Sequence, residues 1–176
     1  ILSADLFNLF VFFEVLSLSA TILIAYKRQL TGLYAAFRYL LVTALSVVLY
    51  LLGLFLLYRE SGELALRAVF DAAGGFEGFH PGQGAPGPIP IAGVLLFTGV
   101  AIRAALVPFH AWLPDAHSQA PHPVSALLSG LMIKAAFLAL WRMVTLFSGT
   151  DFLLNLLLIA LVPSAPLQAL LAPLPL

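Results

Sequence analysis

The feature that most constrains this chain is its repeated runs of about twenty apolar residues, the length that a membrane-spanning helix needs. Residues 6–26 contain one charge, Glu14, and residues 39–58 contain none. At about 1.5 Å per residue, a helix of that length spans about 30 Å, the thickness of a bilayer's hydrocarbon core. Of the 176 residues, 62% are hydrophobic and 9% are charged. Soluble domains carry about 25% charged residues, so the chain is predicted to be a membrane protein.

Two more apolar runs, residues 89–113 and 124–142, follow a polar, Gly- and Pro-rich loop, and residues 152–162 begin a partial fifth run. Pro108 removes a backbone donor within the third run, which predicts a kinked or broken helix. The proline-rich tail, residues 163–176, is left unassigned. We therefore expect an all-α, polytopic transmembrane helix bundle with about four full spans, one of them broken.

The sequence is interpreted as a fragment of a larger fold, because it begins at Ile1 rather than at a methionine, and residues 1–162 are expected to form one partial transmembrane domain. The loop 27–38 holds basic residues and no acid, whereas the loop after residue 58 holds more acids than bases. Lys and Arg near span ends favour the cytoplasmic side, so this first loop and the turn 114–123 are predicted to be cytoplasmic. We expect a multi-pass protein of a prokaryotic inner membrane.

Charge and composition exclude several functions. The formal net charge is zero, which offers no basic face to nucleic acid. Cysteine is absent, and no Gly-rich nucleotide fingerprint precedes a helix, so we expect no iron–sulfur cluster, nucleotide or other cofactor. His117 and His122 lack a third ligand at a recognisable spacing, so no metal site is predicted.

Three ionisable residues lie near the middle of predicted spans: Glu14, Arg103 and Lys134. A central charge costs roughly 2.5–3.5 kcal/mol to insert, so we expect these side chains to be buried against one another or against water. Intramembrane charges mark ion pathways, which makes the three residues candidates for one. The alternatives are a structural ion pair at Glu14 and a plain counter-ion at Lys134.

The neighbours of two of these charges support a pathway. Glu14 shares a helix face with Ser17 and Thr21, which gives one polar stripe on an apolar helix. Lys134 follows small residues at a spacing that lets another helix approach closely. A buried lysine can lose its proton, so Lys134 could act as a member of a relay.

Arg103 and His110 lie on either side of the break expected at Pro108, where backbone carbonyls would be free beside a hydrated cavity. Histidine titrates near neutral pH, so His110 could relay protons, and a structural role is an equal alternative. Arg38, at the predicted start of the second span, either extends its charge to the membrane interface or pairs with Glu14 on the antiparallel neighbour. Both interpretations of Arg38 stay open.

Two segments resemble a known family. ADLFNLFVFFEVLSLSA (residues 4–20) and AIRAALVPFHAWLPDAHSQAPHPVSALLSGLMIKAAFLALWR (residues 101–142) are similar to the antiporter-like subunits shared by Mrp-type multisubunit Na+/H+ antiporters, complex I and membrane-bound hydrogenases. The resemblance implies a position at the fifth to eighth of about fourteen helices, which contain inverted repeats that each have a discontinuous helix. It also implies partner membrane subunits, and protons, exchanged or not for sodium, as the transported ions.

The resemblance also implies roles for single residues. Glu14 matches the family's glutamate on helix five, Arg103 the lysine on broken helix seven, and Lys134 the lysine on helix eight. Arg38 falls where the family often has a basic residue, and His110 matches a histidine that many members have after the break. Arginine at position 103 departs from the family, since it does not readily release a proton. Arg103 therefore either relays protons or only supplies a fixed charge.

Three functions remain open at this point. DLFNLFVFFE (residues 5–14) favours a subunit of a multisubunit cation/proton antiporter. AHSQAPHPVSALLSGLMIK (residues 116–134) favours a hydrogenase-linked subunit. The alternative to the antiporter is thus a proton-pumping subunit of a membrane-bound hydrogenase or of a complex I-type NADH:quinone oxidoreductase. Arg103 and the unusual tail favour a non-conducting membrane scaffold. No catalytic chemistry is expected within the chain itself.

Overall fold

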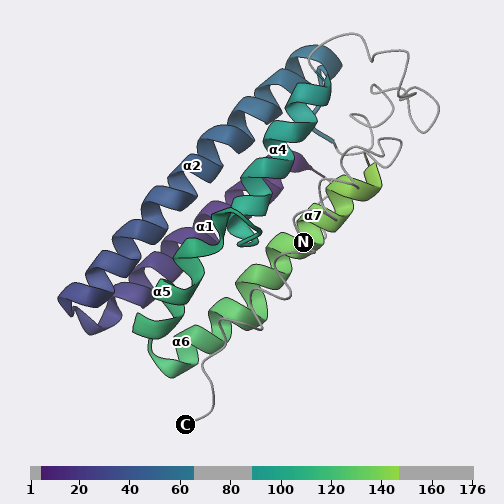
Figure 1. The fold of residues 1–176 in the computed structure, drawn as a ribbon. Helices are drawn as coiled ribbons and strands as arrows, with labels where there is room; N and C mark the ends of the chain where they lie inside the picture. The colour runs from purple at the N-terminus through teal and green to yellow at the C-terminus, as the bar shows by residue number, and fades with distance from the viewer. Residues whose placement is uncertain (1–4, 66–88, 147–176) are drawn as a thin grey trace.

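A computed structural model describes residues 5–65 and 89–146, with side-chain surroundings for 5–65 and 91–143. Within these ranges the chain forms helices and turns, apart from an isolated antiparallel bridge between Asp5 and Ala65 (Figure 1). The predicted all-α class is therefore confirmed. The predicted partial span 152–162 and the tail 163–176 lie outside the described residues.

Six α-helices carry the described part of the fold, and three stretches of it are long and apolar enough to cross a membrane: Leu6–Lys27, Leu30–Ser61 and His122–Met143. The helices are α1 (Leu6–Ile24), α2 (Leu30–Ser61), α4 (Ile89–Arg103), α5 (Trp112–Gln119), α6 (His122–Leu127) and α7 (Ile133–Leu146).

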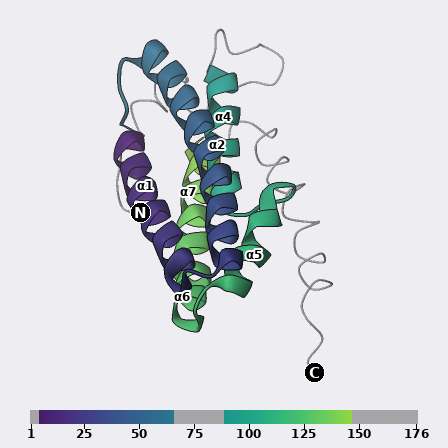
Figure 2. The same ribbon diagram turned by 90° about the vertical axis from the view of Figure 1, so that its left-hand side faces the viewer.

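Helices α1 and α2 form an antiparallel hairpin (Figure 2). Asp5 caps α1, because its carboxylate accepts a hydrogen bond from the N–H of Phe7 at 2.7 Å. α2 begins well before the predicted run of residues 39–58, because Ala35 and Ala36 are buried in the same core cluster as residues of α5 and extend the helix beyond its apolar segment. Arg38 consequently lies inside α2 rather than at its start.

The third predicted span is broken, as expected. α4 ends at Arg103, and the backbone is not helical again until a short 3₁₀ turn at Phe109–Ala111 leads into α5. Ala105 has a left-handed φ of 54°, which turns the chain away from the helix axis. The amide of Leu106 donates to the carbonyl of Ala101 at 3.0 Å, so part of the open helix end is satisfied locally. The break begins at the end of α4, ahead of Pro108 itself.

The fourth predicted span is one continuous rod, although its winding changes midway. α6 and α7 are joined by a π-helical turn, Leu128–Met132. π-turns of this kind are frequent at functional sites. Gly130 lies in this turn, and a Cβ built on it would meet no atom within 4 Å. Nothing in the sequence pattern predicted the turn.

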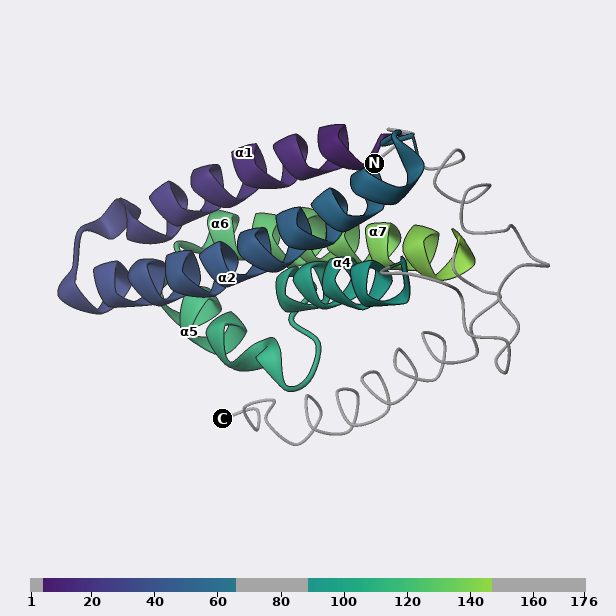
Figure 3. The same cartoon turned by 90° about the horizontal axis from the view of Figure 1, so that it is seen from above.

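Close backbone contact joins α2 to α4, which lie side by side in Figures 2 and 3. A Cβ on Gly53 would lie 2.8 Å from the Ala92 carbonyl oxygen, and a Cβ on Gly99 would lie 3.0 Å from the Ser46 carbonyl oxygen. Only glycine permits such approach without a shift of backbone. α5 packs against α2 at the end of the bundle where α2 follows α1. Residues 27–38 and residues 114–123, both predicted to be cytoplasmic, therefore lie at the same end (Figure 3).

Candidate ion-pathway site

A partly buried ion pair joins the first helix to the broken one. Arg103, the last residue of α4, donates from Nη2 to Oε1 of Glu14 on α1. The Arg103 side chain is 6% exposed and that of Glu14 is 30% exposed. Two of the three central charges predicted from the sequence therefore meet each other, and Glu14 pairs with neither Arg38 nor Lys134.

Every nitrogen of the Arg103 guanidinium has a partner. Nε donates to Ser46 Oγ at 2.8 Å, and Nη1 donates to the Phe13 carbonyl oxygen at 3.0 Å and to Ser17 Oγ. The guanidinium carbon lies 5.4 Å from the centre of the Phe13 ring, a cation–π contact. We call Arg103, Glu14, Ser17 and Ser46 the Arg103 centre.

The chemistry of this centre is that of a fixed cation beside a titratable acid. An arginine with all three nitrogens engaged keeps its proton, whereas a carboxyl group can gain and lose one. The predicted polar stripe on α1 is formed in part, since Ser17 contacts Arg103 and Thr21 donates to the Ser17 carbonyl at 2.9 Å. Ion-pair formation and release at Glu14 is therefore the event that this geometry can support.

Sequence reasoning missed Ser46. Polar atoms recur along the apolar run of α2 at a spacing of four, three and four residues, which places them on one helix face. The residues concerned are Tyr39, Thr43, Ser46 and Tyr50, and all four are buried. This stripe was visible in the sequence, but the uncharged hydroxyls drew no attention beside the three central charges.

Sequence reasoning also missed Asp115. This residue of α5 accepts a hydrogen bond from Arg38 Nη1 in an ion pair whose side chains are 43% (Arg38) and 41% (Asp115) exposed. The hypothesis that Arg38 pairs with Glu14 is wrong, because α5 folds back over the N-terminal third of α2 and supplies a nearer carboxylate. Asp115 was assigned to a polar turn, so its position beside α2 could not be foreseen.

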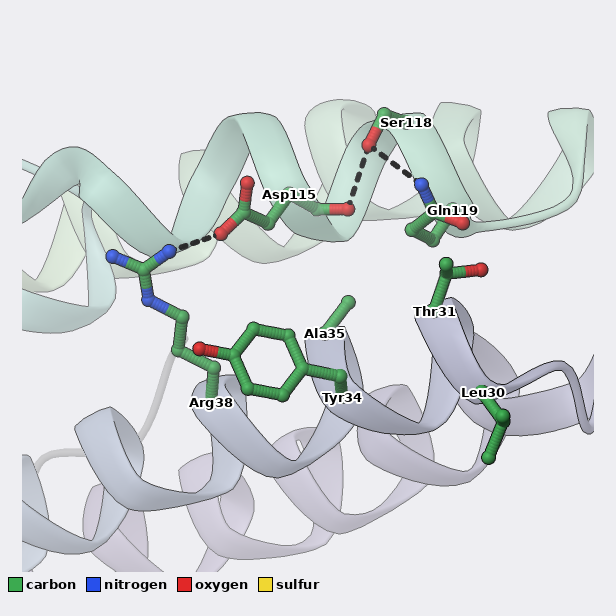
Figure 4. Close-up of a pocket in the computed structure, with 8 residues that line it drawn as sticks. All are labelled: Leu30, Thr31, Tyr34, Ala35, Arg38, Asp115, Ser118 and Gln119. Carbon is green, nitrogen blue, oxygen red and sulfur yellow. Dashed lines mark hydrogen bonds and ion pairs between the residues drawn. The ribbon is translucent and has the colours of Figure 1, made fainter.

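The Arg38–Asp115 pair borders a cavity of about 470 Å³ between α2 and α5 (Figure 4). In Figure 4 the ion pair lies at one end, and Ser118 and Gln119 lie toward the other, opposite Thr31. Most of the lining surface is apolar, and polar groups come from Thr31, Arg38, Asp115, Ser118 and Gln119. These groups offer water hydrogen-bonding partners within the cavity.

An aromatic pair lies beside the Arg103 centre. The rings of Tyr39 and Trp112 are 5.0 Å apart between centres, and both residues are buried. Trp112 Nε1 donates to the Ile102 carbonyl at 3.1 Å, next to Arg103 in the chain. Tyr39 directly follows Arg38 in the chain and interacts electrostatically with Arg103.

The remaining predicted pathway residues do not join the Arg103 centre. Lys134 is exposed on α7 and makes no ion pair or hydrogen bond with the residues that the structure describes. His110 follows the break, and its buried Nδ1 has no hydrogen-bond partner among those residues. Of the three central charges, Glu14 and Arg103 contact each other, whereas Lys134 is exposed and contacts neither.

The two histidines considered as metal ligands have other surroundings. His117 Nδ1 lies 2.6 Å from Ser125 Oγ, which links α5 to α6, and burial lowers the pKa of its imidazole. His122 is exposed at the start of α6. Across residues 5–65 and 89–146, no three His, Asp or Glu side chains gather as a metal site would require.

Comparison with known proteins places these contacts in a family context. Residues 3–173 match the family described as NADH:quinone oxidoreductase/Mrp antiporter, TM. NADH-quinone oxidoreductase subunit N of Desulforudis audaxviator is 38% identical over 140 residues, which cover 80% of this chain and 26% of that protein. The chain thus spans about a quarter of the length of the curated relatives it matches.

Solved structures show the same fold. A chain of the archaeal membrane-bound sulfane sulfur reductase matches with a TM-score of 0.75 at 29% identity, over 88% of this chain and 30% of that one. A chain of the Mrp complex from Dietzia sp. DQ12-45-1b matches with a TM-score of 0.67 at 31% identity, over 81% of this chain and 26% of that one. The broken helix and its neighbours therefore have counterparts in respiratory and antiporter complexes.

Proposed function

Because the chain belongs to the NADH:quinone oxidoreductase/Mrp antiporter transmembrane family, we propose that it forms part of a proton-translocating membrane subunit. The observation that supports this proposal is the partly buried pair of Glu14 and Arg103, which joins a continuous helix to the end of a broken one. A charged pair inside a membrane bundle is costly to keep. A function that uses its charge gives the reason for retaining it.

We assign the roles as follows. Glu14 gains and loses the proton, while Arg103 supplies a fixed positive charge beside it. Lys134 lies on the exposed face of α7, and we propose that it continues the path toward the part of the polypeptide that lies outside this chain. His110 is proposed to act at the break, and Arg38 at the cavity between α2 and α5.

The parent assembly is proposed on the relatives. A subunit N relative favours an NADH:quinone oxidoreductase, and a chain of an Mrp complex favours a multisubunit cation/proton antiporter. In either case we propose that the subunit works with other membrane subunits in a bacterial inner membrane and moves protons, with sodium exchange in the antiporter case. The two cases differ in whether a sodium gradient drives proton movement.

The test uses the intact complex in proteoliposomes. We expect Glu14→Gln to abolish proton uptake, because the variant keeps the shape of the side chain and removes its charge. The matched control is Glu60→Gln, since Glu60 lies near the end of α2 beside Arg59 and away from the Arg103 centre. Normal uptake in Glu14→Gln, with the complex assembled, would contradict the proposal and favour the non-conducting scaffold.

A further inference from the structure

Ser46 is an uncharged, buried residue of α2 that contacts Arg103. Its side chain is fully buried, and its hydroxyl both donates to the Gly99 carbonyl at 2.7 Å and accepts from Arg103 Nε at 2.8 Å. The carbonyl can only accept and the guanidinium can only donate, so a group that does both must lie between them. A hydroxyl meets this condition, and its single proton is committed to Gly99.

The backbone around Ser46 fixes the hydroxyl in space. A Cβ on Gly99 would lie 3.0 Å from the Ser46 carbonyl oxygen and 3.1 Å from the Tyr50 nitrogen, so α2 and α4 are in backbone contact at this level. Arg103 lies one helical turn after Gly99 on α4. The close contact between α2 and α4 therefore fixes the position of Ser46 relative to Arg103.

The direction of Nε determines where the rest of the guanidinium points. The group is planar and rigid, so holding Nε toward α2 sets the directions of Nη1 and Nη2 at the same time. In this structure those two nitrogens donate to Glu14, Ser17 and the Phe13 carbonyl, all on α1. The contact on α2 thus orients the contacts on α1.

We infer that Ser46 is a positioning residue that orients Arg103 and thereby sets the pH at which Glu14 takes up a proton. Without the hydroxyl, the buried Nε–H of Arg103 would lose its partner, which is unfavourable. Arg103 would turn to satisfy Nε and would carry Nη2 away from Glu14. A weaker ion pair favours the ionised carboxylate less, so Glu14 would protonate at higher pH.

Other titratable groups surround this centre. Tyr39 and Tyr50 of α2 interact electrostatically with Arg103, and Tyr39 also interacts with Glu14. On α7, Lys134 is exposed. Removal of the Ser46 hydroxyl changes none of these groups chemically, so a shift in Glu14 titration in that variant reports on the orientation of Arg103.

The test follows the Glu14 carboxyl directly in the intact purified complex. The probe is the infrared C=O stretch of a protonated carboxyl, assigned to Glu14 by its loss in Glu14→Gln and followed through a pH titration. In Ser46→Ala we expect the midpoint to rise by about one pH unit, a tenfold gain in proton affinity. The control is Thr43→Val, which removes a buried hydroxyl from the same face of α2 that donates only to carbonyls of its own helix.

A second variant covers the case in which Ser46→Ala does not assemble. Ser46→Cys keeps a side chain of similar shape with a weaker donor and acceptor, so it should raise the midpoint by a smaller amount. A native midpoint in an assembled Ser46→Ala or Ser46→Cys complex would overturn the inference, as would an equal shift in Thr43→Val.

This inference rests on the proposed function, because it assumes that Glu14 titrates as part of a proton path. The infrared titration does not depend on transport, so the two can fail separately. A shifted midpoint in a complex that moves no protons would keep the positioning role and reject the proposed function. Normal transport with an unshifted midpoint would do the reverse.

Discussion

At the scale of single residues, Arg103 is where the structure is most informative. Its three nitrogens meet four acceptors on two other helices, which is the geometry of an anchored charge. We therefore expect Arg103→Lys to transport protons at a rate similar to that of the native protein, because an ammonium group also supplies fixed positive charge. Proton uptake in proteoliposomes measures this.

Arg103→Ala has a different expected outcome. It leaves the Glu14 carboxylate without its buried partner, and breaking such a pair costs about 3–5 kcal/mol. We expect loss of transport and a less stable complex in thermal unfolding. A large gain in uptake for Arg103→Lys would refute the fixed-charge role, and unchanged uptake for Arg103→Ala would remove the residue from the pathway.

The sequence identified Glu14 and Arg103 because charges stand out in apolar runs, and this signal needs no knowledge of partners. The sequence could not predict which cation pairs with Glu14, because Arg38, Arg103 and Lys134 were all possible partners. The choice depends on helix register and on the fold-back of α5, which are tertiary properties. Ser46 and Asp115 were missed for the same reason, since their importance comes from what lies opposite them.

At the scale of helices, the contact between α2 and α4 depends on glycine. A Cβ on Gly53 would lie 2.8 Å from a backbone oxygen and 3.0 Å from a backbone nitrogen of α4. We expect Gly53→Ala to destabilise the protein by about 1–3 kcal/mol, the usual cost of overpacking, because two helix backbones must separate. Thermal unfolding of the purified protein measures the change.

Gly130→Ala is the matched control for that prediction. A methyl group on Gly130 enters open space within the π-helical turn, so the steric cost is absent. Alanine is also favoured over glycine in helices by about 1 kcal/mol. A loss of stability in Gly130→Ala as large as that in Gly53→Ala would show that the close contact of Gly53 with α4 does not cause the destabilisation.

The junction of α5 and α6 should respond to pH. Burial lowers the pKa of His117 below its ordinary value of about 6.5, so the unfolded chain binds a proton at higher pH than the folded one. Stability from this group is therefore complete above about pH 6.5 and is lost as the pH falls through the lowered pKa. We expect hydrogen exchange at this junction to quicken on acidification in the native protein.

His117→Asn removes the titration while keeping a polar side chain near Ser125, 2.6 Å from the histidine nitrogen in the native structure. The pH dependence of exchange at the junction should then flatten. Equal acceleration in the native protein and in the variant would assign the effect to another group.

At the scale of the whole molecule, apolar run lengths were enough to predict a helical membrane bundle, and Pro108 was enough to predict one broken span. The length of an apolar run indicates whether a helix can cross a bilayer, and this length is a local property of the sequence. Run length did not predict that α2 begins as early as Leu30, because the first turns of α2 are stabilised by packing against α5 rather than by lipid. Run length did not predict the π-helical turn at Leu128–Met132 either, since a change in helical winding leaves the hydrophobicity of the sequence unaltered.

The pairing of Glu14 with Arg103 also sets an order of events during biosynthesis. The two residues are 89 positions apart, and ribosomes add about 5–20 residues per second, so Glu14 leaves the ribosome roughly 4–18 s before Arg103. During that interval α1 and α2 are made while the carboxyl group lacks this partner. The insertion machinery therefore handles α1 and α2 while the central acid of α1 still lacks Arg103 as its partner.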